Sequence, residues 1–157
     1  MLDINCIIRI LFVPQNTSFY ISDPSILGSK LFDSMTSIKS YKAFSDENNA
    51  TGFVLNTDFG NIKLNIMHTD QIESHLNGFG GYIHSQMQND NDLTYVMARL
   101  RYVSLVLGGV IDHKDGDEEN VHKFLFEFNS AINGLMFLYD SVWDWSSDAL
   151  CGPHKNS

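Results

Sequence analysis

Four side chains between residues 68 and 84 are of the types that bind zinc in proteins. They are His68, Asp70, His75 and His84, and imidazole and carboxylate groups are common zinc ligands. Their spacing does not fit one helix face, because His75 and His84 are nine residues apart and would point in different directions. The HExxH pattern of zinc hydrolases is also absent. We therefore predict no metal site, and no other pattern in the chain calls for a cofactor.

The run from Asp112 to Glu119 has the acidic composition of a calcium-binding loop. An EF-hand loop has acidic or amide side chains at positions 1, 3 and 5, glycine at position 6 and glutamate at position 12. Counted from Asp112, position 3 is Lys114 and position 6 is Asp117, and counting from Asp115 also fails at position 6. The pattern instead indicates a solvated turn before a helix, whose first turn favours acidic side chains.

Nucleophilic catalysis and phosphate binding find little support in the sequence. Ser85 has no GxSxG motif around it, and Cys151 has no local signature of a nucleophilic cysteine. The glycine-rich stretch 77–82 lacks a preceding apolar strand and the GxGxxG spacing, so it indicates a helix whose glycines allow close packing. The sequence thus favours a protein that is not an enzyme.

An alternative function is centred on the same glycine-rich stretch. It is a small enzyme or a small-molecule-binding domain with a pocket around residues 78–86, lined by Tyr82, His84 and Gln86. A deep pocket with converging polar groups at this place would favour the alternative.

The distribution of charge is the most informative pattern. The chain carries a formal net charge of −9, and residues 115–150 hold eight acidic residues against one basic residue, Lys123. The same segment holds both tryptophans of the chain. Large rings anchor protein–protein contacts, and charges steer the partner toward them. We therefore predict a protein-binding surface made of Asp115, Asp117, Glu118, Glu119, Tyr139, Asp140, Trp143, Asp144, Trp145 and Asp148.

A second interpretation of this segment is purely structural. In it, Trp143 and Trp145 fill the core, and the acidic residues only keep the surface solvated. Direct nucleic-acid binding is disfavoured in both interpretations, because phosphate contacts need a basic patch and the sequence shows none. The expected partner is a basic protein, and a homo-oligomer stays open.

Hydrophobic periodicity predicts the elements that would position these residues. Pro14 is expected to end the first strand, and Gly60 suits the turn of a hairpin. The predicted fold class is α+β, in the form of a two-layer sandwich with helices packed on one face of a mainly antiparallel sheet. The strands at 105–111 and 135–139 could also pair in parallel. Strands are predicted over 4–13, 52–57, 61–67, 105–111 and 135–139, helices over 22–35, 70–88, 93–103 and 117–132, and a hairpin or irregular arm over 142–150.

The length of 157 residues fits one domain, which we place at residues 1–150, followed by a flexible tail at 151–157. No run of about 18 apolar residues is present, so no membrane-spanning helix is expected. Two cysteines are too few for a disulfide scaffold, although a single bridge between Cys6 and Cys151 stays open. These features predict a soluble protein of a reducing cytoplasm.

Two short motifs carry a resemblance to known sequences. The stretch Gly78–Gln86, and Ile132–Phe137 followed by Asp144, resemble parts of uncharacterised bacterial domains. The resemblance covers about the second half of the chain and implies a bacterial or phage-like cytoplasmic protein with no assigned activity. The charge pattern leads to the expected function, which is to bind and neutralise a basic protein partner. A toxin-neutralising immunity protein or an inhibitor is the most concrete form of this expectation.

Overall fold

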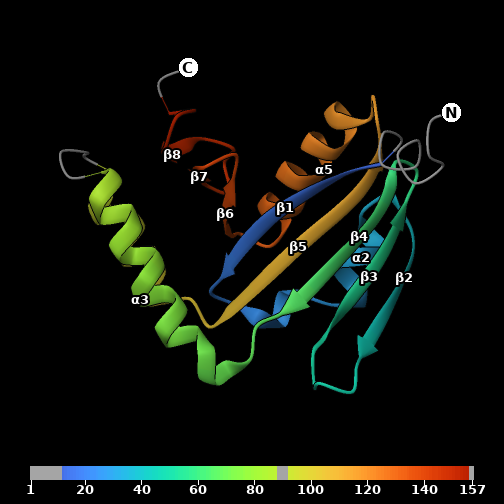
Figure 1. Ribbon diagram of the computed structural model, residues 1–157, viewed down its shortest axis with the longest axis horizontal. Coiled ribbons are helices and arrows are strands. Elements are labelled where there is room, and N and C mark those ends of the chain that lie inside the picture. Colours follow the sequence, from blue (N-terminus) through green and yellow to red (C-terminus); the bar gives the residue numbers. More distant parts are fainter. Residues whose placement is uncertain (1–11, 88–91, 156–157) are drawn as a thin grey trace, which may run out of the picture.

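The computed structural model describes residues 12–87 and 92–155 of the chain (Figure 1). Its helices are a short 3-10 helix η1 (Pro24–Ile26), α2 (Ser29–Ser34), α3 (Thr69–Gln86), α4 (Leu93–Arg101) and α5 (Glu118–Ala131). Its strands are β1 (Phe12–Ile21), β2 (Ile38–Ser45), β3 (Thr51–Thr57), β4 (Gly60–Ile66), β5 (Leu105–Lys114), β6 (Leu135–Leu138), β7 (Ser141–Trp143) and β8 (Ala149–Cys151).

The eight described strands form one sheet in the order β2-β3-β4-β5-β1-β6-β7-β8, and every neighbouring pair is antiparallel. The predicted α+β class with an antiparallel sheet is therefore confirmed. The strands at 105 and 135 do not pair with each other, because β1 lies between them and is antiparallel to both. The first described strand, β1, thus occupies the middle of the sheet.

Two local predictions are wrong, and one strand, β2, is missed. The first strand continues through Pro14, which lies where β1 pairs with β5 alone, since β6 pairs only with Ser18–Tyr20. Proline is tolerated there because no described strand pairs with the other edge of β1 at that position. Strand β2 is missed because its sequence does not alternate regularly between apolar and polar residues. The helix predicted over 22–35 is interrupted at Leu27, whose backbone is extended. Cys6 and most of the strand predicted over 4–13 lie outside the described residues.

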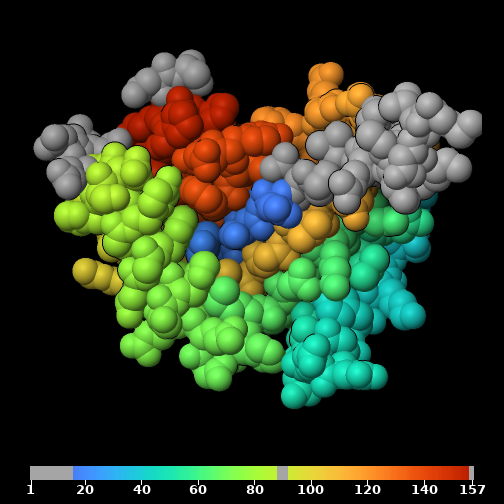
Figure 2. Space-filling view, viewed as in Figure 1, coloured from blue at the N-terminus to red at the C-terminus, as the bar shows by residue number. Residues whose placement is uncertain are grey.

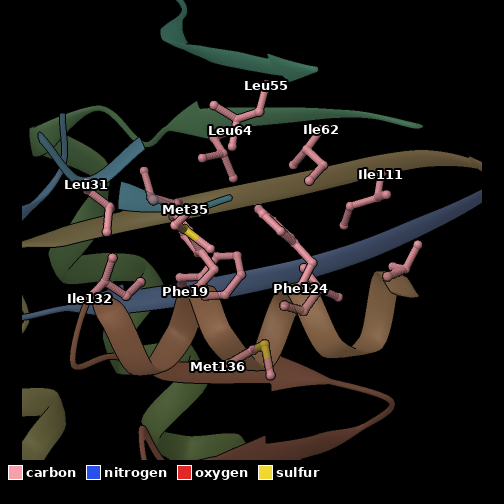
Figure 3. Close-up of a cluster of buried hydrophobic side chains, with 14 of the residues drawn as sticks. Phe19, Leu31, Met35, Leu55, Ile62, Leu64, Ile111, Phe124, Ile132 and Met136 are labelled. Atoms are coloured by element: carbon pink, nitrogen blue, oxygen red, sulfur yellow. The ribbon is translucent and has the colours of Figure 1, made fainter. Parts of the chain in front are cut away.

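The larger core lies between the sheet and helices α2 and α5. Figure 3 shows Phe19, Ile62 and Ile111 of the sheet in the same cluster as Leu31 of α2 and Phe124 of α5, and all five are buried. Packing helices against one face of the sheet is what the sequence predicts. The apolar face predicted for the helix at 117–132 points into this core.

A second core lies on the opposite face, under α3 and α4. Tyr20 and Val106 point to that face, because successive residues of a strand alternate between faces. Figure 2 looks onto it, and α3 lies beside the strands β6–β8 while parts of β1, β5 and β4 are visible without a covering helix. The prediction of helices on one face therefore describes α2 and α5 and leaves out α3 and α4. An amphipathic stripe on a helix does not show which face of a sheet it covers.

The end of the described chain is packed against the sheet. Cys151, which the sequence prediction assigns to a tail, is buried as the last residue of β8. The backbone N–H of His154 donates a hydrogen bond of 3.1 Å to Ser141 Oγ at the start of β7. The segment after β8 therefore lies along the β6–β7 hairpin, next to residues predicted to bind a partner.

Candidate protein-binding surface

One side of α5 packs against the β6–β7 hairpin through aromatic rings. His122 and Phe126 lie four residues apart and so occupy the same helix face, and their ring centroids are 4.4 Å apart. Phe126 contacts Trp143 of β7 edge-on at 4.9 Å, and His122 stacks on Tyr139 at 6.0 Å. The helix and the hairpin are thus joined along a seam of alternating rings.

The segment after β8 closes this seam into a ring of contacts. The imidazole of His154 lies 5.9 Å from the ring of Tyr139 and 5.5 Å from that of Trp143. We call the set His122, Phe126, Tyr139, Trp143 and His154 the five-ring cluster. Its members come from three segments that are far apart in the sequence, so helix, hairpin and C-terminal segment must all fold to form it.

The turn that presents Tyr139 has an unusual backbone. Leu138 pairs with Ser141, and the two residues between them, Tyr139 and Asp140, have φ angles of 54° and 59°. Such a two-residue turn normally has Asn-Gly, because positive φ angles are unfavourable for large side chains. Gly152, with φ of 95°, packs on the turn, and a Cβ at that position would overlap the carbonyl oxygen of Asp140. The C-terminal segment therefore supports a strained turn that projects an aromatic and an acidic side chain.

The two tryptophans have different environments. Trp143 is half-buried, packs against the larger core and donates a hydrogen bond of 3.0 Å from Nε1 to the carbonyl oxygen of Leu138. Trp145, in the turn between β7 and β8, is 45% exposed. The interpretation that both rings fill the core thus applies to Trp143 alone, and Trp145 is available to a partner.

Six of the seven predicted acidic residues lie toward the two ends of α5, and the seventh, Asp140, lies in the β6–β7 turn. Asp115, Asp117, Glu118 and Glu119 precede or begin the helix, whereas Asp144 and Asp148 lie in the β7–β8 turn near its last turns. The amide of Asn129 donates to the backbone oxygen of Asp144, which fixes this second location. A helix of 14 residues is about 20 Å long. These six residues therefore form two groups, with the helical rings of the five-ring cluster between them.

Asp144 is already engaged within the molecule. Its Oδ1 lies 3.3 Å from Arg99 Nη1 and accepts a hydrogen bond of 2.9 Å from the hydroxyl of Tyr95. Only 12% of its side chain is exposed. Arg99 also donates to the backbone oxygen of Asn133 at 2.7 Å. Asp144 thus ties α4 to the β7–β8 turn, which places it outside the surface that a partner could contact.

Asp117 is also displaced from the predicted surface. It lines a polar cleft of about 430 Å³ on another side of α5, together with Asp58, Phe59 and Glu127. It occupies the N-cap position expected from the sequence, but its Oδ1 accepts from the amide of Asn120 instead of a helix backbone N–H. Position along the chain alone does not tell which side of a helix terminus an acid occupies.

Local electrostatics keep the end of α5 near the turn negative. Hydrogen bonds from the backbone N–H groups of Glu118 itself and of Gly116 lower the pKa of the Glu118 carboxyl. Burial, and next the charge of Glu118, raise the pKa of Tyr139. Burial, and next the charge of His154, lower the pKa of His122. Glu118 thus keeps its charge one helical turn before His122, which stacks on the exposed ring of Tyr139.

We define the acidic–aromatic surface from these placements. Of the predicted binding residues, the surface retains those of the β6–β7 hairpin, those of the exposed part of the β7–β8 turn, and three of the four acids near the start of α5. Asp117 and Asp144 are excluded. His122, Phe126 and His154 are additions, of which the first two could have been found from their helical spacing after Glu118. His154 gave no local signal in the sequence. The acidic–aromatic surface consists of the five-ring cluster with Asp115, Glu118, Glu119, Asp140, Trp145 and Asp148.

The glycine-rich stretch lies in the middle of α3. A cleft of about 610 Å³ is present between α3 and α4, but Gly80 is the one residue from 78–86 that lines it. Tyr82, His84 and Gln86, which the alternative function places in a pocket, are exposed and do not line this cleft. The close packing predicted for the glycines applies to Gly80, which faces Met97, while Gly78 and Gly81 have no neighbouring atoms where a Cβ would lie.

The described residues offer neither a metal cluster nor a membrane-spanning helix. No group of three or more His, Cys, Asp or Glu side chains among them is arranged to hold a metal ion. In the same ranges, no helix has both the length and the apolar character needed to cross a membrane.

Comparison with known proteins adds no relative. No protein-family model, curated protein or solved structure matches this chain. The resemblance of Gly78–Gln86 and Ile132–Phe137 to bacterial domains gains no support from these comparisons.

Proposed function

We propose that this protein binds and neutralises a basic protein through its acidic–aromatic surface. In its most concrete form, it is a cytoplasmic immunity protein that covers the working surface of a toxin, or an inhibitor of similar design. The observation that carries the proposal is the pairing of exposed rings with carboxylates on one folded unit. Tyr139 is followed by Asp140 and stacks on His122, one helical turn after Glu118, and Trp145 lies three residues before Asp148.

Each component of the surface has a separate physical role. The exposed rings of Tyr139 and Trp145 can enter pockets of a partner and exclude water, which is how a few residues supply most of the binding energy in many interfaces. The carboxylates raise the rate of encounter with a positively charged partner, and salt weakens that effect. The half-buried rings of Phe126 and Trp143 hold this surface rigid, so that little entropy is lost on binding.

Capture of a partner from the native host, followed by kinetic measurements, would test this function. Neutralising the surface with Glu118→Gln and Asp148→Asn should slow association several-fold at low salt and reduce its salt dependence. A matched control is Glu47→Gln with Asp70→Asn. It removes the same charge from the β2–β3 turn and the first turn of α3. If both double variants alter association equally, net charge alone acts and the surface has no special role.

The exposed tryptophan provides an independent test. Trp145→Ala should leave the melting temperature nearly unchanged and speed dissociation of the partner by an amount equivalent to about 2 kcal/mol. Trp143→Ala should instead lower the free energy of unfolding, because its ring packs on Phe126 and the core. Unchanged dissociation of the Trp145→Ala protein would remove that ring from the interface.

A further inference from the structure

The cleft between α3 and α4 lies apart from the acidic–aromatic surface and has an apolar floor. Helices α3 and α4 pack against each other and against the second core, and the cleft of about 610 Å³ opens between the first half of α3 and the end of α4. This volume is typical of sites that bind small molecules. The floor is made of Ile72, Leu76, Gly80, Met97, Leu100 and Val103.

Gly80 and Met97 make the floor open and adaptable. Any side chain at residue 80 would project toward the methyl group of Met97, which lies 3.4 Å from the place of a Cβ. The glycine therefore leaves free volume between the helices. Methionine is flexible and polarisable, so that it adjusts to the shape of an apolar ligand and makes favourable contacts with aromatic rings.

The walls of the cleft carry one charge of each sign. Glu73 lines it from α3, and Arg101 lines it from the end of α4. Within residues 12–87 and 92–155, neither side chain takes part in an ion pair, and they do not pair with each other across the cleft. Both exposed charges are therefore available to a ligand that lies between the helices.

We propose that this cleft binds a small zwitterion with a large apolar body, the chemistry of a free hydrophobic α-amino acid. The carboxylate of the ligand meets the guanidinium of Arg101, its ammonium group meets the carboxylate of Glu73, and its side chain lies on the apolar floor. This arrangement satisfies both wall charges at once, whereas a ligand with a single charge leaves one of them unpaired. The site is independent of the acidic–aromatic surface and of any protein partner.

Four forms of phenylalanine separate the contributions of the two charges. They are L-phenylalanine, N-acetyl-L-phenylalanine without the cation, L-phenylalaninamide without the anion, and N-acetyl-L-phenylalaninamide without either. The last compound also represents a phenylalanine inside a peptide. Titration of the full-length protein, followed by amide chemical shifts in NMR spectra, gives both the affinity and the location. We expect shifts at Gly80, Leu100 and Arg101, and about tenfold tighter binding of the zwitterion than of either singly charged form.

Substitutions in the walls make the assignment specific. Arg101→Gln should weaken binding of phenylalanine and its N-acetyl form about tenfold and leave the amide form unchanged. Glu73→Gln should weaken phenylalanine and the amide form and leave the N-acetyl form unchanged. Lys42→Gln and Glu47→Gln remove exposed charges at the β2 edge and serve as matched controls without effect. Gly80→Leu should abolish binding of all four compounds by filling the floor; if that variant does not fold, the two charge variants decide.

Three outcomes would overturn the proposal. Equal affinity for all four compounds would show that the cleft is an apolar groove that accepts peptide side chains and does not distinguish ligands by their charged groups. Shifts located outside the cleft would show binding elsewhere. Absence of any shift at about 10 mM ligand, where a Kd of 1 mM would give nearly full occupancy, would show that the cleft does not bind this class of ligand.

Discussion

Two aromatic seams join helices to the sheet, and they differ in one decisive respect. In each, a histidine lies four residues before a phenylalanine on a helix, as His75 and Phe79 on α3 and as His122 and Phe126 on α5. The α3 seam comprises Tyr20, His75, Phe79, Tyr82 and Phe137, and the α5 seam is the five-ring cluster. The β6–β7 hairpin lies between the seams, with Phe137 toward α3 and Trp143 toward α5.

The tyrosine that stacks on the helical histidine differs between the two seams. Tyr20 is 2% exposed, stacks on Phe79 at 4.4 Å, and its hydroxyl shares a hydrogen bond of 2.9 Å with His75 Nε2. Tyr139 is 38% exposed, and no hydrogen bond to its hydroxyl is found within the described ranges. Tyr20 belongs to the central strand β1, whereas Tyr139 belongs to a turn. The same pairing of ring types thus serves as core on one face and as a candidate contact surface on the other.

The largest expected effect is loss of the phenylalanine from the buried seam. Phe79→Ala should lower the free energy of unfolding by about 3 kcal/mol, because it removes stacking on a buried ring and leaves a cavity. Phe126→Ala should lower it by about 1.5 kcal/mol, since its ring partners are the exposed His122 and the half-buried Trp143. Urea denaturation of both variants measures the difference. Equal losses would mean that the two seams contribute equally to the core.

The tyrosine hydroxyls provide a second comparison. Tyr20→Phe should destabilise the fold by about 1–2 kcal/mol, because His75 loses its partner inside a partly buried site. Tyr139→Phe should change stability by less than about 0.5 kcal/mol. Thermal melts of the two variants at the same pH test this pair. A destabilised Tyr139→Phe protein would contradict the view that its ring is held by stacking alone.

Replacing an exposed glycine of α3 by alanine should increase the stability of the protein. Gly81→Ala should stabilise the protein by up to about 1 kcal/mol, because residue 81 is helical and a methyl group there meets no neighbouring atom. Gly80→Ala is the control, since its methyl group would contact Met97. Helix α5 has no glycine and offers no such gain. If Gly81→Ala is destabilising, residue 81 has a role that requires a bare backbone.

The smallest expected effect concerns pH. Burial lowers the pKa of His122 in the folded protein, so the unfolded chain binds a proton first as the pH falls below about 6.5. The contribution of this group to stability is therefore present at higher pH and is lost as the pH falls through the region below the unfolded pKa. His122→Gln should reduce the fall in melting temperature between neutral and mildly acidic pH. An identical slope in both proteins would show that other groups cause the fall.

The sequence predicts those parts of the fold that depend on local chemistry. The β3–β4 hairpin at Gly60 and the helices α3, α4 and α5 follow from turn residues and apolar spacing, and all of them are found close to their expected bounds. Strand β2 was missed because its alternation is interrupted by Lys39 and Ser40, where the pairing register shifts. The division of helices between two faces was missed because it depends on the pairing of distant strands.

The sequence predicted which segment carries the candidate surface, but it did not predict all of the residues that form it. Acid-rich composition and two tryptophans marked the correct segment, yet Asp144 is engaged by Arg99 from a helix more than 40 residues earlier. His154 joins the cluster through a chain reversal after β8 that no local motif announces. Spacing along one helix can be read from sequence, whereas contacts between segments must be read from the fold.

The central position of β1 has a consequence for synthesis of the chain. Its pairing partners are β5 and β6, whose first residues lie 84 and 114 positions after the end of β1. At a translation rate of about 5–20 residues per second, β1 leaves the ribosome several seconds before either partner exists. Meanwhile β2, β3 and β4 can pair among themselves. The nascent protein must therefore keep its middle strand unpaired until late, which makes that interval the time of greatest need for a chaperone.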